Sequence, residues 1–166
     1  MQNVSARLMT PIFILMKKWH VELLESSREI LADNGKEGLG DICALLKSEA
    51  PQYDWVGFYW MNDAEQTLRL GAYSGASTEH VLIPYGKGIC GQVALSGRAL
   101  LVPNVHAEEN YLACSTTTQS ELVVPIFQND RCIGQIDIDS HTLHAFTEED
   151  QRFLEYLSGL VSEVMS

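Results

Sequence analysis

The chain has 166 residues, of which 46% are hydrophobic and 20% charged, and its formal net charge at pH 7 is −11. This length and composition are typical of one globular domain and exclude a disordered chain or a disulfide scaffold. The acidic balance argues against a nucleic-acid partner and against binding to an anionic membrane surface, because both need clustered Lys and Arg side chains.

The cysteines and one apolar run near the N-terminus bear on cofactors and on the compartment. The cysteines at positions 43, 90, 114 and 132 form no metal-ligand spacing, so we expect no metal and no other cofactor. The apolar run at residues 8–16 is too short to cross a membrane and lacks the features of a signal peptide. We therefore expect a cytoplasmic protein whose thiols stay reduced unless they are catalytic.

In chain order, two helices come first. Thr10-Pro11 predicts the start of a helix, apolar residues follow at helical spacing, and Asn34-Gly35 predicts its end. A second helix is predicted over residues 37–48, where apolar residues again fall on one face.

Strands dominate the middle of the chain, and they are predicted over residues 54–61, 67–73, 81–83, 100–102, 121–127 and 131–139. Between them, a Gly-rich passage enters a short helix at residues 91–96, and residues 103–120 form a long loop with one helical turn. Asn129-Asp130 predicts a tight hairpin, and Thr147 with Asp150 predicts a capping box that opens a final helix. Short turns between strands, with helices at the chain ends, predict an α+β fold: an antiparallel sheet with helices packed on its faces.

Two cysteines lie in settings that favour reactivity. Cys90 is flanked by Gly88 and Gly91 at a helix N-terminus, whose positive end favours a thiolate. Cys114 lies in the long polar loop, where a thiol is accessible. The alternatives are that Cys90 is a small buried apolar residue and that Cys114 anchors the loop to the core. The other two cysteines fall within apolar patterns and are predicted to be structural.

Three acidic residues and two aromatic residues are candidate binding groups. Strand alternation places Asp137 and Asp139 on one face of the sheet, and Glu121 begins the neighbouring strand and could join them. Like charges so close are tolerated where they bind a cation or where one holds a proton, and the alternative is a solvated face. Trp55 and Tyr59 share a face of their strand, and they form either core or the wall of a ligand pocket.

Taken together, these segments resemble a GAF domain and, within that family, the free methionine-(R)-sulfoxide reductases. The resemblance rests on DWVGFYW (54–60), IPYGKGICGQ (83–92), YLACSTTTQSELVVPI (111–126) and GQIDIDS (134–140), with FTEEDQRFLE (146–155) as a closing helix. It implies a GAF fold with a six-stranded antiparallel sheet in residues 37–166. It also implies a homodimer, in which the N-terminal helix of residues 1–36 could contact the partner subunit.

The resemblance further implies a reaction. Cys114 matches the cysteine that attacks the sulfur of free methionine sulfoxide and becomes a sulfenic acid. Cys90 matches a second cysteine that condenses with it to a disulfide, which a thioredoxin-type reductant then reduces. Three acids match those that hold the substrate ammonium and supply the proton, and two aromatic residues match the pocket wall: Glu121, Asp137, Asp139, Trp55 and Tyr59.

One position departs from the family. Its members normally have a further cysteine ten residues before the one that matches Cys90, and this chain has His80 there. Cys90 could then resolve the sulfenic acid alone, or a small-molecule thiol could do so. The protein could instead be a signalling module that senses a small molecule without turnover. His80 could keep Cys114 ionised or could simply lie at the surface.

Overall fold

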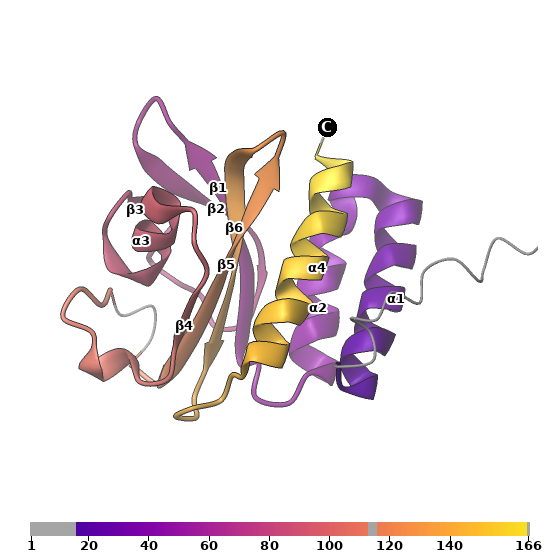
Figure 1. Cartoon of the computed structure of the whole chain (residues 1–166), viewed down its shortest axis with the longest axis horizontal. Coiled ribbons are helices and arrows are strands. Elements are labelled where there is room, and N and C mark those ends of the chain that lie inside the picture. Colours follow the sequence, from indigo (N-terminus) through magenta and orange to yellow (C-terminus); the bar gives the residue numbers. More distant parts are fainter. Residues whose placement is uncertain (1–15, 113–115, 166) are drawn as a thin grey trace, which may run out of the picture.

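The computed structural model describes residues 16–112 and 116–165, and it has three layers (Figure 1). A six-stranded sheet lies in the middle, two helices cover one face with a third helix packed outside them, and a fourth helix with its flanking loops covers the other face. The helices are α1 (Lys18–Asn34), α2 (Leu39–Glu49), α3 (Gly88–Ser96) and α4 (Glu148–Val164). The strands are β1 (Trp55–Asn62), β2 (Thr67–Ser74), β3 (Leu82–Pro84), β4 (Leu100–Val102), β5 (Ser120–Gln128) and β6 (Arg131–Ser140).

The sheet has the order β3-β2-β1-β6-β5-β4, and each paired neighbour runs antiparallel. The predicted antiparallel sheet is therefore confirmed, and each predicted strand is present within one or two residues of its expected ends. The first and last long strands of the sequence, β1 and β6, lie side by side at the centre. This pairing brings residues 55–60 next to residues 134–139, segments that are far apart in the sequence.

The predicted turns agree with the structure, but two predicted helix starts need correction: α3 begins at Gly88, three residues before the expected Gly91, and the start of α1 also differs. Asn129 and Asp130 both have positive φ, at 50° and 61°, as a tight hairpin between right-twisted strands requires. Gly35, with φ of 55°, ends α1 as expected. The predicted start of α1 was wrong in part, because Met16 and Lys17 are not helical and the helix begins at Lys18. The expected start at Thr10-Pro11 lies outside the described residues.

The two faces of the sheet bury two separate apolar cores. Alternate residues of β1, β5 and β6 face α1, α2 and α4 and form the larger core, which includes Phe58, Ile136 and Ile138. The residues between them face α3 and form the smaller core, which includes Trp55 and Tyr59. Ile136 and Ile138 lie in the larger core, on the face opposite Asp137 and Asp139, as strand alternation requires.

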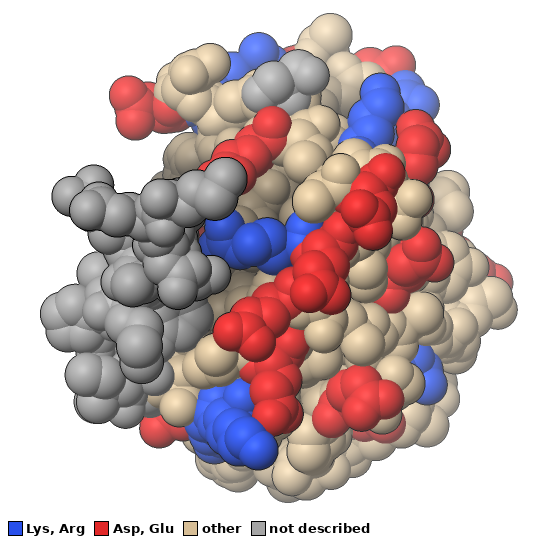
Figure 2. Space-filling view, turned by 90° about the vertical axis from the view of Figure 1, so that its right-hand side faces the viewer, with Lys and Arg blue, Asp and Glu red and all other residues tan. Residues whose placement is uncertain are grey.

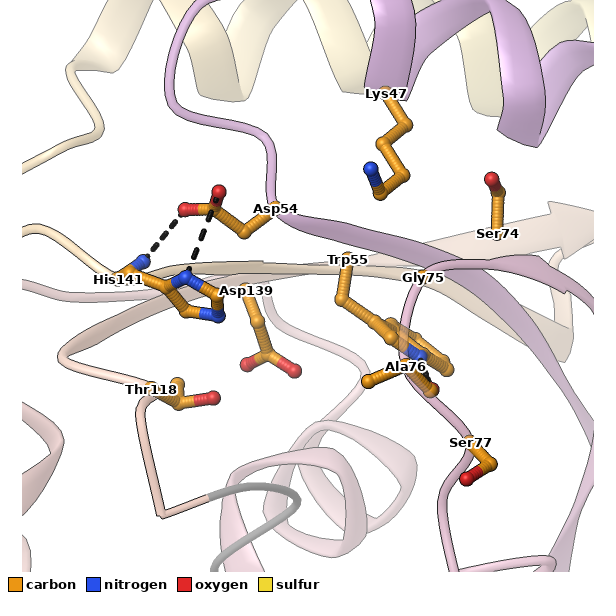
Figure 3. Close-up of a pocket in the computed structure, with 10 residues that line it drawn as sticks. All are labelled: Lys47, Asp54, Trp55, Ser74, Gly75, Ala76, Ser77, Thr118, Asp139 and His141. Carbon is orange, nitrogen blue, oxygen red and sulfur yellow. Dashed lines mark hydrogen bonds and ion pairs between the residues drawn. The ribbon is translucent and has the colours of Figure 1, made fainter.

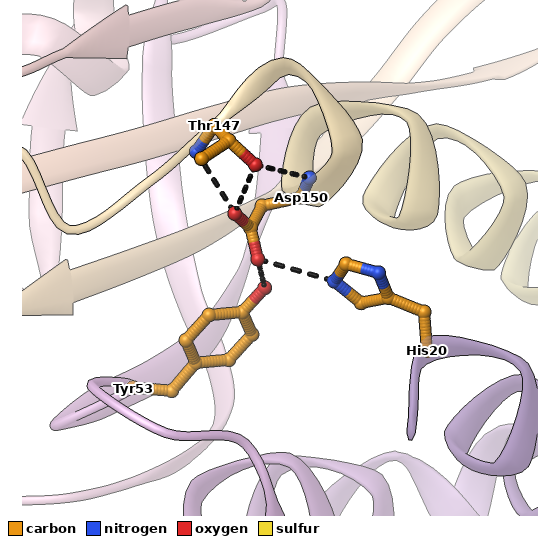
Figure 4. Close-up of polar contacts among 4 residues, drawn as sticks. All are labelled: His20, Tyr53, Thr147 and Asp150. Atoms are coloured by element: carbon orange, nitrogen blue, oxygen red, sulfur yellow. Dashed lines mark hydrogen bonds and ion pairs between the residues drawn. The ribbon is translucent and has the colours of Figure 1, made fainter. Parts of the chain in front are cut away.

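A buried polar cluster connects α1, α4 and the start of β1 (Figure 4). Asp150 closes the capping box at the start of α4, where its carboxylate accepts hydrogen bonds from the backbone N–H and hydroxyl of Thr147. Its other oxygen lies 2.9 Å from the Tyr53 hydroxyl and 3.1 Å from Nε2 of the fully buried His20. One carboxylate thus fixes the cap of α4 and the position of α1 above the sheet.

The helical layer carries much of the negative charge. Figure 2 views the molecule from the side of α1, where acidic side chains spread over the surface with smaller groups of basic side chains between them. The exposed acids on α1 and α4 include Glu22, Glu25, Glu29, Glu148 and Glu155. Among the described helices, none combines the length and the apolar character needed to cross a membrane.

Candidate functional site

Three adjacent strands bring the predicted acids and Trp55 to the same end of the sheet. Trp55 of β1 pairs with Asp139 of β6, and Asp139 pairs in turn with Glu121 of β5. Asp137 lies two residues before Asp139, opposite Gly57 of β1, and so faces the same side. The candidate site therefore lies between the sheet and α3, on the side away from the three long helices.

The indole of Trp55 lies flat against its own strand because two glycines leave room for it. A Cβ on Gly57 would lie 2.3 Å from the Trp55 ring, and a Cβ on Gly75 would lie 2.4 Å from the ring. The indole N–H donates a hydrogen bond to the carbonyl of Ala76, 3.1 Å away, which fixes the ring against the loop after β2. The Trp-x-Gly pattern of β1 thus produces a flat aromatic wall.

Tyr59 lies behind this wall in the smaller core. It is fully buried, its ring stacks with that of Trp55 at 6.3 Å between centroids, and its hydroxyl donates to the carbonyl of His80 at 2.9 Å. Tyr59 therefore supports the indole and fixes the loop before β3. His80 is half-buried.

The three acids are buried almost completely, with exposures of 2% for Glu121, 0% for Asp137 and 2% for Asp139. Burial, together with the nearby charge of Asp137, raises the pKa of Glu121 and of Asp139 well above the usual range. Burial also raises the pKa of Asp137 to about 7, although hydrogen bonds from Cys90 and Glu121 oppose that rise. Burial therefore favours the neutral, protonated form of each of these three acids.

Cys90 meets this cluster from the other side. It lies in the first turn of α3, at the helix N-terminus where the sequence had placed it, and is 3% exposed. Its Sγ lies 3.3 Å from Asp137 Oδ2 and 3.8 Å from Glu121 Oε1. The ligand atoms of Cys90, Glu121 and Asp137 all lie within 4.8 Å of one another, so within the described residues these three could hold a metal ion.

The other cysteines divide as follows. Cys114, the predicted nucleophile, lies outside the described residues. Cys43 is fully buried, donates to the carbonyl of Ala72, and has its pKa raised to about 12 by burial. Cys132 is half-buried at the far end of β6, and burial raises the pKa of its thiol as well. Neither setting favours a reactive thiolate.

A pocket of about 450 Å³ opens beside the acids (Figure 3). Trp55 and Asp139 line it, whereas Cys90 and Glu121 line a neighbouring cavity of only about 10 Å³, and Tyr59 and Asp137 line neither. Sequence reasoning missed six further lining residues with polar side chains: Lys47, Asp54, Ser74, Ser77, Thr118 and His141. Asp54 directly precedes Trp55 and His141 follows the DIDS segment, so their positions beside known site strands were the available signal.

Asp54 and His141 form a pair at the rim of this pocket (Figure 3). The backbone N–H of His141 donates to Asp54 Oδ2 at 2.7 Å, and its ring Nδ1 lies 3.6 Å from Asp54 Oδ1. Nε2 of the same ring lies 3.0 Å from the hydroxyl of Thr117. The pair thus links the start of β1, the end of β6 and the segment that leads into β5.

Comparison with known proteins agrees with this geometry. The model of the GAF domain family matches residues 38–166. The free methionine-R-sulfoxide reductase of Escherichia coli K12 is 33% identical over 128 residues, which cover 77% of this chain and 76% of that protein. The reductase of the same name from Saccharomyces cerevisiae is 39% identical over 119 residues, covering 70% of this chain and 66% of that one.

A solved structure extends the agreement to three dimensions. The X-ray structure of free methionine-R-sulfoxide reductase from Neisseria meningitidis, in complex with its substrate, superimposes with a TM-score of 0.82 at 34% identity. The match covers 87% of this chain and 86% of that chain. The chain therefore belongs to the GAF domain family, in which it resembles the free methionine-(R)-sulfoxide reductases.

Proposed function

We propose that this protein reduces free methionine-(R)-sulfoxide to methionine. The observation that carries the proposal is the meeting of a thiol, Cys90, with three buried carboxyl groups beside an aromatic-walled pocket. Reduction of a sulfoxide needs a proton for the departing oxygen, and burial raises the pKa of Glu121 and of Asp139, which favours the protonated form that can supply it. The named activity of the relatives from bacteria and yeast points to the same substrate.

The proposed reaction has three balanced steps. The Cys114 thiolate attacks the sulfoxide sulfur, and the sulfoxide oxygen takes one proton from the acid cluster. The S–O bond breaks, the hydroxyl group is transferred to the Cys114 sulfur to form a sulfenic acid, and methionine is released. The Cys90 thiol then displaces water from that sulfenic acid and forms a Cys90–Cys114 disulfide. A thioredoxin-type dithiol reduces this disulfide to two thiols and is itself oxidised. The acids also hold the substrate ammonium, and Trp55 packs against the substrate side chain.

The test is a coupled assay with thioredoxin, thioredoxin reductase and NADPH, in which free methionine-(R)-sulfoxide is added and loss of NADPH is followed. We expect turnover by the native chain and none by Cys114→Ser. The same rate for both proteins, with thioredoxin or with dithiothreitol, would overturn the proposal. Turnover with dithiothreitol alone would show that Cys90 does not resolve the sulfenic acid in the absence of a cysteine at position 80.

A second candidate function is a GAF module that senses a small molecule without turnover. The observation that favours it is the separation of the 450 Å³ pocket from Cys90, which lines a different cavity. In that case the pocket binds its ligand through Trp55 and Asp139, and the thiols take no part. Binding of methionine sulfoxide that is unchanged in Cys90→Ser and Cys114→Ser, with no turnover by the native chain, would support this function.

A further inference from the structure

The pocket beside Trp55 has an ionisable side chain on its inner wall and another at its opening (Figure 3). Asp139 lies on its inner wall, with its carboxyl group pointing into the space between Thr118 and the indole. Lys47 extends from the last turn of α2 across the opening, above the indole. Asp54 and His141 lie at the rim between these two levels.

The acid at the rim, Asp54, already has close polar partners on both oxygens. Asp54 receives the backbone N–H of His141 at 2.7 Å and the Ser140 hydroxyl at 3.5 Å on one oxygen, and the His141 ring lies 3.6 Å from the other. All three contacts come from the end of β6, so Asp54 is held by that strand. Its oxygens are thus engaged without any contribution from Lys47.

Two side chains that line the pocket, Lys47 and Asp139, have polar atoms without a partner among the described residues. The side chain of Lys47 is exposed and makes no hydrogen bond or ion pair within the described part of the chain. Asp139 is 2% exposed, and its Oδ1 has no hydrogen-bond partner among the described residues. A buried polar atom without a hydrogen-bond partner is destabilising, and a ligand that supplies a donor there removes this cost.

A ligand that satisfies both groups has a cationic donor at its inner end and an anionic group at the rim. An α-amino acid has this arrangement, because its ammonium and carboxylate groups are both attached to the α-carbon. We infer that Lys47 binds the α-carboxylate of the substrate while Asp139 holds the ammonium. This inference rests on the proposed function and adds a recognition residue to it.

The assignment explains how the pocket would distinguish a free amino acid from a residue within a protein. A methionine sulfoxide inside a polypeptide has neither an ammonium nor a carboxylate, so it leaves both Lys47 and Asp139 without partners. The pocket volume of about 450 Å³ is in the range of sites for small molecules. Lys47 therefore acts as a specificity residue at the entrance, remote from the reacting sulfur.

The test removes the charge of Lys47 and the charge of the ligand carboxylate, separately and together, as in a double-mutant cycle. Titration calorimetry measures the affinity of each combination. The probes are L-methionine-(R)-sulfoxide and its carboxamide, which lacks the negative charge, and the host is Cys114→Ser so that no turnover interferes. We expect the free acid to bind about fivefold more tightly than the amide. In Lys47→Met this preference should disappear, and Lys47→Arg should restore it.

Lys36→Met is the matched control, because Lys36 is equally exposed but lies in the turn between α1 and α2, outside the residues that line the pocket. It should keep the preference for the free acid. An equal loss of affinity for acid and amide in Lys47→Met, or no loss for either, would overturn the inference. The cycle measures binding alone, so lack of turnover in the coupled assay would count against the proposed function and not against Lys47.

Discussion

At the scale of single residues, Gly57 determines the shape of the aromatic wall. A Cβ at Gly57 would meet the six-membered ring of the indole at 2.3 Å, and Gly75 packs just as closely against the five-membered ring, which limits how far the indole can move. Gly57→Ala is therefore expected to lower the free energy of unfolding by roughly 1–3 kcal/mol and to weaken ligand binding. Urea unfolding followed by tryptophan fluorescence measures the first effect.

Gly159→Ala is the control for this change. Gly159 is exposed on α4, and a Cβ there would meet nothing within 4 Å. Alanine at an open helical position stabilises by about 0.5–1 kcal/mol, so the two substitutions should have opposite signs. If Gly57→Ala were as stable as the native chain, the close fit between the strand and the indole would be wrong.

Asp139 tests whether the acids serve function or folding. Burial raises the pKa of Asp139 well above the usual range and so favours its neutral form, which asparagine matches closely in shape. Asp139→Asn should change the free energy of unfolding by less than about 1 kcal/mol. It should lower reductase activity by about 100-fold or more, since it removes the ionisable partner of the substrate ammonium.

The measurements for Asp139 are the coupled assay and the urea midpoint, made on the same preparations. Asp130→Asn is the control, because Asp130 is exposed in the β5–β6 turn and asparagine suits its positive φ. That variant should keep both activity and stability. Parallel losses of activity and stability in Asp139→Asn would mean that the carboxyl group is needed mainly for folding.

At the scale of elements, Asp150 connects the start of α4 to α1. Its hydrogen bonds to His20, Thr147 and Tyr53 outweigh burial and lower its pKa to about 2. Asp150→Asn should cost roughly 2 kcal/mol of unfolding free energy at pH 7, because the amide cannot accept as many hydrogen bonds. Hydrogen exchange should show α1 opening more readily, since His20 then loses its charged partner.

Glu148→Gln is the comparison for Asp150, since Glu148 lies in the same first turn and is exposed, and it pairs with Arg152 at 3.7 Å. Exposed pairs of this kind contribute little, so the urea midpoint should hardly move. An Asp150→Asn protein that unfolds at the same urea concentration as Glu148→Gln would show that the cluster in Figure 4 does not hold α1 in place.

At the scale of the whole molecule, the local patterns of the sequence were enough to predict the sheet, its turns and the shared face of Asp137 and Asp139. Strand alternation and the Asn129-Asp130 turn depend only on residues that are close in the sequence, so the sequence is enough to predict them. The place of Lys47 in the pocket lining could not be predicted in this way, because it depends on how α2 packs against β1, a contact between elements. The pocket rim at His141 depends likewise on the pairing of β1 with β6.

The predicted start of α1 was wrong in part, because a local sequence signal there is overridden by tertiary packing. Thr10-Pro11 is a good local signal for a helix start, but Met16 and Lys17 are outside the helix, which begins one residue before the half-buried Trp19. Packing of Trp19 and His20 against Phe153 accompanies the first turn of α1. Tertiary contacts of this kind override local propensity, because most helical stability in proteins comes from packing.

The stability of the whole molecule should depend on pH in two opposite ways. Asp150 has a pKa of about 2 in the folded chain, below its usual value, so its contribution is complete above pH 4 and is lost as the pH falls toward 2. Asp137 has a pKa of about 7, above its usual value, so the folded chain binds an extra proton between pH 4 and pH 7. That contribution is lost as the pH rises through 7.

Unfolding free energy should therefore be highest near pH 4 and should fall by roughly 1–3 kcal/mol toward pH 8, which urea midpoints at pH 3, 4, 5 and 8 will measure. The net charge of −11 adds general repulsion in the same direction, so the decisive comparison is with Asp137→Asn. This variant keeps the surface charge but lacks the buried titrating group, and its loss between pH 5 and pH 8 should be smaller. An equal loss in both proteins would mean that surface repulsion alone sets the pH dependence and that Asp137 ionises without cost.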